Sequence, residues 1–77
     1  MNKQVETEFL TSEGLARLED RIQCRLGGRV RGLQILLREQ GLILRGHAQT
    51  YYAKQLAQHA VMESVSLPIR ANEISVS

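Results

Sequence analysis

Residues 33–46 read LQILLREQGLILRG, and this stretch decides the fold. Large aliphatic side chains occupy every second position in both of its halves, which is the spacing of strands with one buried face. The side chains expected on that buried face are Leu33, Ile35, Leu37, Leu42 and Leu44. Gln40-Gly41 is a suitable two-residue turn between the halves, because glycine accepts the positive φ of tight hairpins. The stretch therefore predicts an antiparallel hairpin.

The opposite face of this hairpin is predicted to be a surface that contacts a partner. A turn at Gln40-Gly41 would pair Leu37 with Leu44 and Leu36 with Arg45. The residues then displayed away from the core include Leu36, Arg38, Ile43, Arg45 and His47. Bulky apolar groups flanked by cations on a solvent-facing sheet are typical of a partner surface. We take these five residues as the candidate interaction face.

A helix is predicted before the hairpin, over residues 12–26. Its apolar stripe recurs every three or four residues and consists of Leu15, Leu18, Ile22 and Leu26. Thr11 or Ser12 can cap its start, and Gly27 with Gly28 can end it. Cys24 falls on the side opposite the stripe, so we expect it to be exposed and without function.

A second helix is predicted after the hairpin, over residues 51–63, with Thr50 as its cap and an alanine-rich inner stripe. Pro68 forbids a continuing helix, and the alternation of Ile74 and Val76 predicts a short last strand. The order is α-β-β-α-β, and a right-handed crossover makes the last two strands parallel. We expect an α+β fold, with a three-stranded mixed sheet and two helices packed on one face. The predicted core is Leu18, Ile22, Leu26, Ile35, Leu37, Leu44, Leu56, Ala57, Ile74 and Val76.

This pattern resembles a BON domain, a small bacterial module with the same element order. The resemblance runs from Leu18 to Val76. It is carried by the helix stripe Leu18, Ile22 and Leu26, by Leu42-x-Leu44-x-Gly46, by Ala53, Ala57 and Ala60, and by Val65 followed by Asn72-x-Ile74-x-Val76. It implies a single BON-like domain over residues 12–77, preceded by a poorly ordered or loosely packed segment over residues 1–11. It also implies a binding module without catalytic residues, with phospholipid or another envelope component as its ligand.

Two residues of that pattern have physical reasons to be where they are. Gly46 is expected to close the second strand, because a residue without a side chain lets the chain bend toward the helix start. Asn72 is expected to pair its short amide with backbone at the entry to the last strand.

The charge of the chain is concentrated in its middle third. Residues 21–46 hold six arginines against the single acidic residue Glu39, so an anionic partner is favoured there. Within this part, residues 27–32 join the first helix to the first strand, and their glycines with Arg29 and Arg31 could contact a phosphate. Arg29 and Arg31 are therefore the candidate anion contacts.

Catalysis and metal binding find little support in the sequence. Cys24, His47 and His59 are the candidate groups, and they fall on three different predicted elements. One cysteine also excludes an internal disulfide. We expect no enzyme, no metal and no cofactor.

Four classes of partner stay open. Anionic phospholipid or a partner protein is favoured, and a homo-oligomerising domain is the alternative. Single-stranded nucleic acid is least favoured, because the predicted sheet has no aromatic residue for base stacking and the chain has no GxxG loop.

The location in the cell depends on what adjoins the chain. Residues 1–10 contain no apolar run typical of a signal peptide, and no run of about 18 apolar residues predicts a membrane span. We expect a cytoplasmic protein if the chain is complete, and an envelope-associated one if it is excised from a longer exported protein.

Overall fold

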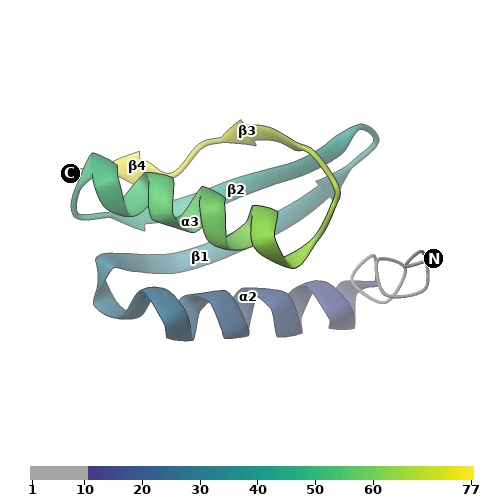
Figure 1. Cartoon of the computed structure of the whole chain (residues 1–77), viewed down its shortest axis with the longest axis horizontal. Coiled ribbons are helices and arrows are strands. Elements are labelled where there is room, and N and C mark those ends of the chain that lie inside the picture. Colours follow the sequence, from purple (N-terminus) through teal and green to yellow (C-terminus); the bar gives the residue numbers. More distant parts are fainter. Residues whose placement is uncertain (1–10) are drawn as a thin grey trace.

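The computed structural model describes residues 11–77, so residues 1–10 of the predicted N-terminal segment lie outside the described part. The elements are α2 (Ser12–Leu26), the 3-10 turn η1 (Gly27–Arg29), β1 (Val30–Arg38), β2 (Gly41–Ala48), α3 (Tyr51–Ser64), β3 (Ile69–Asn72) and β4 (Ser75–Val76). Figure 1 shows α2 running beside β1. The predicted α+β class and the α-β-β-α-β order are confirmed.

Both helices begin and end as the sequence indicates. The Thr11 hydroxyl accepts a hydrogen bond from the Gly14 amide at 2.9 Å, and the Thr50 hydroxyl accepts one from the Ala53 amide at 3.0 Å. Each cap satisfies a backbone donor that the first helical turn leaves free. Gly27 ends α2 with a φ of 60°, a conformation that favours glycine.

The sheet is built around β2. β1 pairs with it antiparallel on one side, and β3 and β4 both pair with it parallel on the other, as the predicted crossover requires. The predicted single last strand is thus two short strands, and β3 was not foreseen. Asn72 makes the break: its side-chain oxygen accepts from the Ile74 amide, and its side-chain nitrogen donates to the Lys54 carbonyl, both at 3.2 Å. The expected pairing of the Asn72 amide with backbone is confirmed.

The predicted hairpin register is wrong by two residues. Leu37 pairs with Leu42 and Leu36 with Ile43, so the turn residues are Glu39 and Gln40. A two-residue shift leaves every side chain on its predicted face, so alternation alone could not detect it. Gly41 belongs to β2 instead of the turn, and a Cβ there would collide with the carbonyl oxygen of Pro68.

Gly46 has a different role from the predicted one. β2 continues past it to Ala48, so Gly46 does not close the strand. The pairing of β1 with β2 is irregular between Arg31 and Gln34, where Gly32 has a φ of 63°. A Cβ at Gly46 would lie 3.0 Å from the Arg31 carbonyl oxygen and 3.3 Å from the Leu33 Cα. Gly46 therefore lets the backbone of the irregular segment of β1 approach closely.

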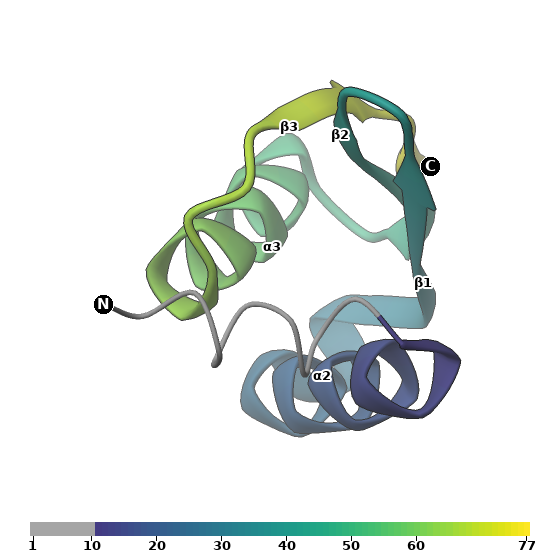
Figure 2. The same cartoon turned by 90° about the vertical axis from the view of Figure 1, so that its right-hand side faces the viewer.

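Figure 2 shows both helices on one side of the curved sheet, and the buried apolar side chains lie between the helices and that face. The buried apolar residues are Leu18, Ile22, Leu26, Val30, Leu33, Ile35, Leu42, Leu44, Ala48, Ala53, Ala57, Ala60, Val61, Val65 and Ile74. Of the predicted core, Leu37 and Leu56 are only half-buried. The prediction for Val76 is wrong, since it is 43% exposed. It pairs with Ala48 at the end of the sheet, where the chain already turns toward α3.

Side chains of α2 close the outer edge of β1. The Ile35 amide donates to the Glu19 carboxylate at 2.9 Å, and the Leu33 amide donates to the side-chain oxygen of Gln23 at 3.1 Å. The Gln23 side-chain nitrogen donates in turn to the Val30 carbonyl. An edge strand with free backbone groups invites pairing with another chain, so these contacts protect the sheet. No helix within residues 11–77 is both long and apolar enough to cross a bilayer.

Candidate functional site

The face of the sheet turned away from the helices is the predicted interaction face, and we call it the outer face. Its middle is an apolar row in which Leu36 pairs with Ile43, and Ile43 pairs with Ala71 on β3. The corrected register thus makes Leu36 and Ile43 direct cross-strand neighbours, which are the pairs that interact most strongly in a sheet. Both side chains are half-buried, so the apolar row is continuous but shallow.

One flank of the apolar row is polar and partly neutralised. Arg45 pairs with Gln34 across the strands, and its Nε donates to the Glu73 carboxylate at 3.0 Å. Beyond it, His47 pairs with Arg31, and the His47 Nδ1 lies 3.1 Å from the Ser75 hydroxyl. Arg45 and Glu73 are each about half exposed, so this ion pair contributes little to stability.

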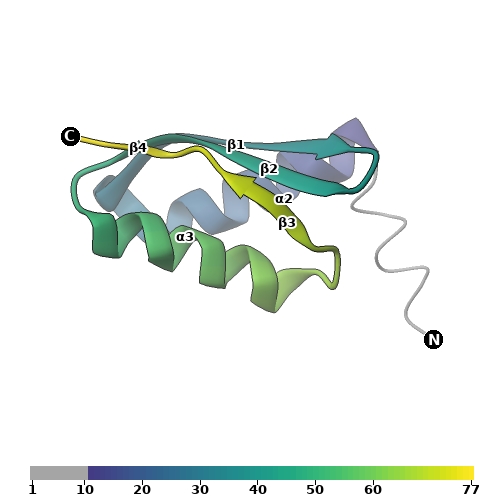
Figure 3. The ribbon, with the colours of Figure 1, turned by 90° about the horizontal axis from the view of Figure 1, so that it is seen from above.

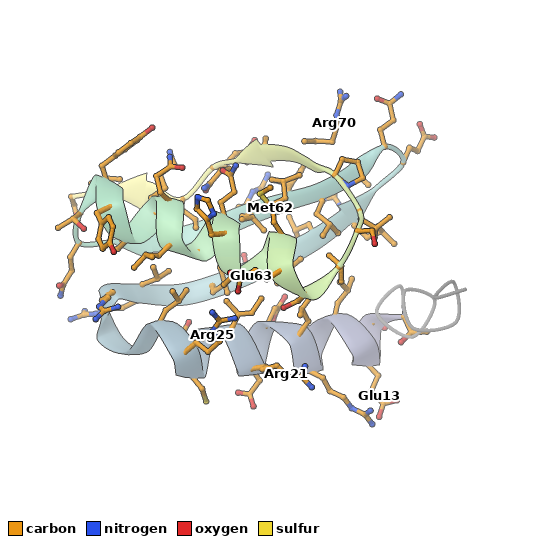
Figure 4. All side chains as sticks on the ribbon, in the orientation of Figure 1. Glu13, Arg21, Arg25, Met62, Glu63 and Arg70 are labelled. Carbon is orange, nitrogen blue, oxygen red and sulfur yellow. The ribbon has the colours of Figure 1, made fainter. Side chains whose placement is uncertain are left out.

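The other flank, at the hairpin end, carries two arginines. Arg38 pairs with Gly41, and the Arg70 side chain passes close to the same glycine. The Arg38 guanidinium donates to the carbonyl of its neighbour Leu37 at 3.0 Å, and Figure 4 shows Arg70 extending away from the body of the molecule. Both residues are exposed, and neither forms an ion pair with a described residue. Their charges are therefore available to an anionic partner.

The two candidate anion contacts have different surroundings. Residues 27–32, which join α2 to the sheet, form a 3-10 turn and the start of β1. Arg29 lies in that turn and is exposed. Arg31 lies in β1 and lines an open hollow together with His47, Ala48, Gln49 and Ser77. The structure thus brings Arg31 to His47 of the interaction face and leaves Arg29 outside that hollow.

The candidate catalytic groups are not brought together. Cys24 is exposed on α2, as predicted, while His47 lies on β2 and His59 on α3. The His47 ring contacts the Ser75 hydroxyl, and no hydrogen bond among residues 11–77 joins it to the Cys24 thiol or to the His59 imidazole. Among residues 11–77, no three or more histidine, cysteine, aspartate or glutamate side chains are placed to hold a metal ion.

A second surface was missed by the sequence reasoning. Within the described chain, the large hydrophobic side chains that remain most exposed are Tyr51, Tyr52 and Met62 of α3, at 65%, 69% and 54%, and Val76 of β4. The three on α3 lie away from its buried alanines. The available signal was the side of the predicted helix opposite the alanine stripe, which contains aromatic and sulfur side chains where charges are usual.

Comparison with known protein families, with curated proteins and with solved structures finds no match for this chain.

Proposed function

We propose that this chain is a non-catalytic binding module whose outer sheet face contacts anionic phospholipid. The observation that carries the proposal is the apolar row of Leu36, Ile43 and Ala71, which is bordered at the hairpin end by Arg38 and Arg70. Apolar side chains favour the interfacial region of a bilayer, and arginines favour its anionic head groups. The resemblance to BON domains, which is part of the proposal, implies the same class of ligand.

The charges on the outer face favour an anionic partner over a neutral one. It carries arginines on three strands, namely Arg31 and Arg38 on β1, Arg45 on β2 and Arg70 on β3. Within residues 11–77, Arg45 is the only one of these four that forms an ion pair, with Glu73. A basic residue near an anionic membrane contributes about 1 kcal/mol to binding, so the unpaired arginines together give an appreciable affinity.

Phospholipid fits this face better than single-stranded nucleic acid does. Sequence-tolerant binders of single strands stack bases on aromatic side chains. The residues of the central row are Leu36, Ile43 and Ala71, and the two tyrosines of the described chain lie on α3. A face with aliphatic residues between cations offers a bilayer both kinds of contact and offers a base no stacking platform.

The test is flotation of the purified chain with vesicles of phosphatidylglycerol and, in parallel, of phosphatidylcholine. We expect binding to the anionic vesicles and a loss of binding as salt rises. The variant Arg38→Gln/Arg70→Gln should bind about 30-fold more weakly, since two basic residues contribute about 2 kcal/mol. Leu36→Ser/Ile43→Ser should also weaken binding while the fold is kept.

The matched control is Arg17→Gln/Arg21→Gln, which removes the same charge from α2. Both arginines are exposed, and Figure 4 shows Arg21 pointing away from the rest of the molecule. This control should keep most of the binding. Equal losses in both double variants would show that net charge, and not the outer face, drives the association. Binding of short single-stranded RNA at the same affinity and salt dependence would favour nucleic acid instead.

A further inference from the structure

The side of α3 turned away from the core carries a row of uncharged side chains. Its inner side packs Ala53, Ala57, Ala60 and Val61 into the core. At 100° per residue, the positions opposite Ala57 are 52, 55, 59 and 62. These residues are Tyr52, Gln55, His59 and Met62, and we call them the α3 stripe. Three of them are exposed and Gln55 is half-buried, and Figure 3 shows no other described element on that side of α3.

The composition of the α3 stripe is that of a contact surface. It has no aspartate, glutamate, lysine or arginine. The corresponding side of α2 holds Arg17, Asp20 and Cys24. Depletion of charge with enrichment of tyrosine and methionine distinguishes the centre of a protein interface from the rest of a surface. The α3 stripe is therefore better suited to a protein partner than to water.

We propose that the α3 stripe binds the α3 stripe of a second copy of this chain, with the two helices antiparallel. The stripe is symmetric about Ala57: Tyr52 and Met62 lie five residues before and after it, and Gln55 and His59 lie two residues before and after it. A two-fold interface requires such self-complementarity, because residue i contacts residue j and residue j contacts residue i. An antiparallel pair centred at Ala57 places Tyr52 against Met62 of the second copy, and Gln55 against His59 of the second copy.

Each of these two contacts is chemically favourable. A methionine sulfur near an aromatic ring gives an attractive contact, and the flexible side chain of methionine adapts its shape to the ring. A glutamine amide and an imidazole can exchange a hydrogen bond, which satisfies polar groups in the middle of the interface. Both contacts occur twice across the two-fold axis.

The charges beside the α3 stripe do not oppose this association. Glu63 lies next to Met62 and is paired with Arg25 of α2 at 3.2 Å, as the two side chains pointing toward one another in Figure 4 show. Its charge is therefore partly neutralised within the same copy. Lys54 lies toward the core side of the helix and is half-buried. An antiparallel pair thus brings no uncompensated like charges of α3 into contact.

The size of the interface sets the expected affinity. α3 has 14 residues. At about 1.5 Å per residue it is roughly 21 Å long. Two α3 stripes with their adjoining Tyr51 side chains would bury on the order of 1,000 Å² in total, the low end for specific interfaces. We expect a reversible dimer with a dissociation constant in the micromolar range.

This inference does not rest on the proposed lipid binding. α3 packs on the inner face of the sheet, so the outer face stays uncovered in such a dimer. The two outer faces point in opposite directions. Loss of self-association on substitution of the α3 stripe therefore tests the stripe, and loss of vesicle binding on substitution of the outer face tests the outer face.

The test is sedimentation equilibrium of the whole chain over a concentration series from low micromolar to near millimolar. The average mass should rise from 8.7 kDa toward twice that value. Tyr52→Lys alone and Met62→Glu alone should each weaken dimerisation by about tenfold or more, because each places a charge against an apolar group. An equimolar mixture of these two variants should dimerise again, since the antiparallel arrangement sets the new lysine against the new glutamate at one end and keeps Tyr52 against Met62 at the other.

The mixture decides the geometry, because a parallel pair would set the new lysine against Tyr52 and the new glutamate against Met62, and its dimerisation would stay weaker than that of the parent chain. Cys24→Glu is the control, a charge placed on the outer side of α2, and it should leave the dimerisation unchanged. Circular dichroism of every variant checks that the fold is kept. The proposal is overturned if the mass stays at 8.7 kDa throughout, or if dimerisation persists in both single variants. A monomeric chain whose vesicle binding is lost on Met62→Glu would show that the stripe contacts lipid instead.

Discussion

The two helices of this domain are almost equal in length, but the sides that face away from the core have different roles. α2 has 15 residues and α3 has 14, and each begins at a threonine cap. α2 uses Glu19 and Gln23 to bind the backbone edge of β1, and its remaining outer side is charged. α3 packs small residues against the sheet and leaves tyrosines and a methionine exposed. α2, whose side chains bind the edge of β1, has a charged outer side that is suited to water. α3, whose side chains do not bind that edge, has an uncharged outer side that is suited to a partner.

This difference follows from where each helix lies. α2 runs beside β1, so its side chains reach backbone groups that would otherwise attract another strand. α3 lies between the inner face of the sheet and solvent. On that side of the sheet, β2 already pairs with β3 and with β4. The backbone of the sheet therefore needs no hydrogen bond from the α3 stripe. Its composition is therefore explained better by association than by the needs of the fold.

The largest expected effect is on the core side of α2. Ile22 is fully buried beneath the sheet, and Ile22→Ala removes its side-chain carbons beyond Cβ from a packed interior. We expect the free energy of unfolding to fall by about 2–5 kcal/mol, measured by urea denaturation. A loss of this size is a large share of the stability that so small a domain can have. A loss below about 0.5 kcal/mol would contradict the observed packing of α2.

The core side of α3 should respond to the opposite change. Ala57 is completely buried and lets the helix approach the sheet closely. Ala57→Leu inserts a large side chain where the packing leaves no room, so we expect a loss of about 1–3 kcal/mol in urea denaturation. If the variant were more stable than the parent chain, α3 would have space beneath it, and its small residues would not be required for close packing.

The next effect compares two glutamines, one on each helix. Gln23 joins α2 to the Leu33 amide and the Val30 carbonyl, so Gln23→Ala should cost about 1–2 kcal/mol by leaving backbone groups at the edge of β1 without partners. The Gln55 side chain forms no hydrogen bond with another residue of the described chain, and Gln55→Ala should change stability by less than about 0.5 kcal/mol. Equal losses in urea denaturation would mean that the edge contacts of α2 contribute nothing of their own.

Much of this arrangement could be predicted from local patterns, and the rest depends on distant contacts. Helix bounds and caps follow from Thr11, Gly27 and Thr50, because a cap acts within one turn. The register does not, because a shift of two residues preserves the alternation. The register depends on Pro68, which lies 27 positions beyond Gly41. The Pro68 carbonyl oxygen takes the space of a side chain at Gly41 and accepts a hydrogen bond from the Leu42 amide at 2.9 Å.

The candidate sites show the same limit. Alternation placed Leu36 and Ile43 on the outer face, and the structure keeps them there as direct neighbours. It could not show that Arg31 would meet His47, because that contact depends on the irregular segment around Gly32. Val76 alternates like a core residue and yet is exposed, because burial at the end of a strand depends on whether another element covers that end. The α3 stripe was readable from the sequence once the charges of the two helices were compared.

The smallest expected effect is on the rate at which a thiol is labelled, and it compares the outer sides of the two helices. Cys24 is exposed on α2, so a thiol reagent under reducing-agent-free, low-oxygen conditions should label it in the native chain at close to the rate of the unfolded chain, at every protein concentration. In a Cys24→Ser background, His59→Cys places the thiol at the centre of the α3 stripe and keeps the Tyr52 and Met62 contacts. Its labelling should slow a few-fold as protein concentration rises through the dissociation constant, because only the monomer exposes it, whereas adding Met62→Glu should abolish that dependence. If labelling at position 24 slows with concentration instead, the copies meet through α2, and the charged side of that helix, not the neutral side of α3, is the surface that associates.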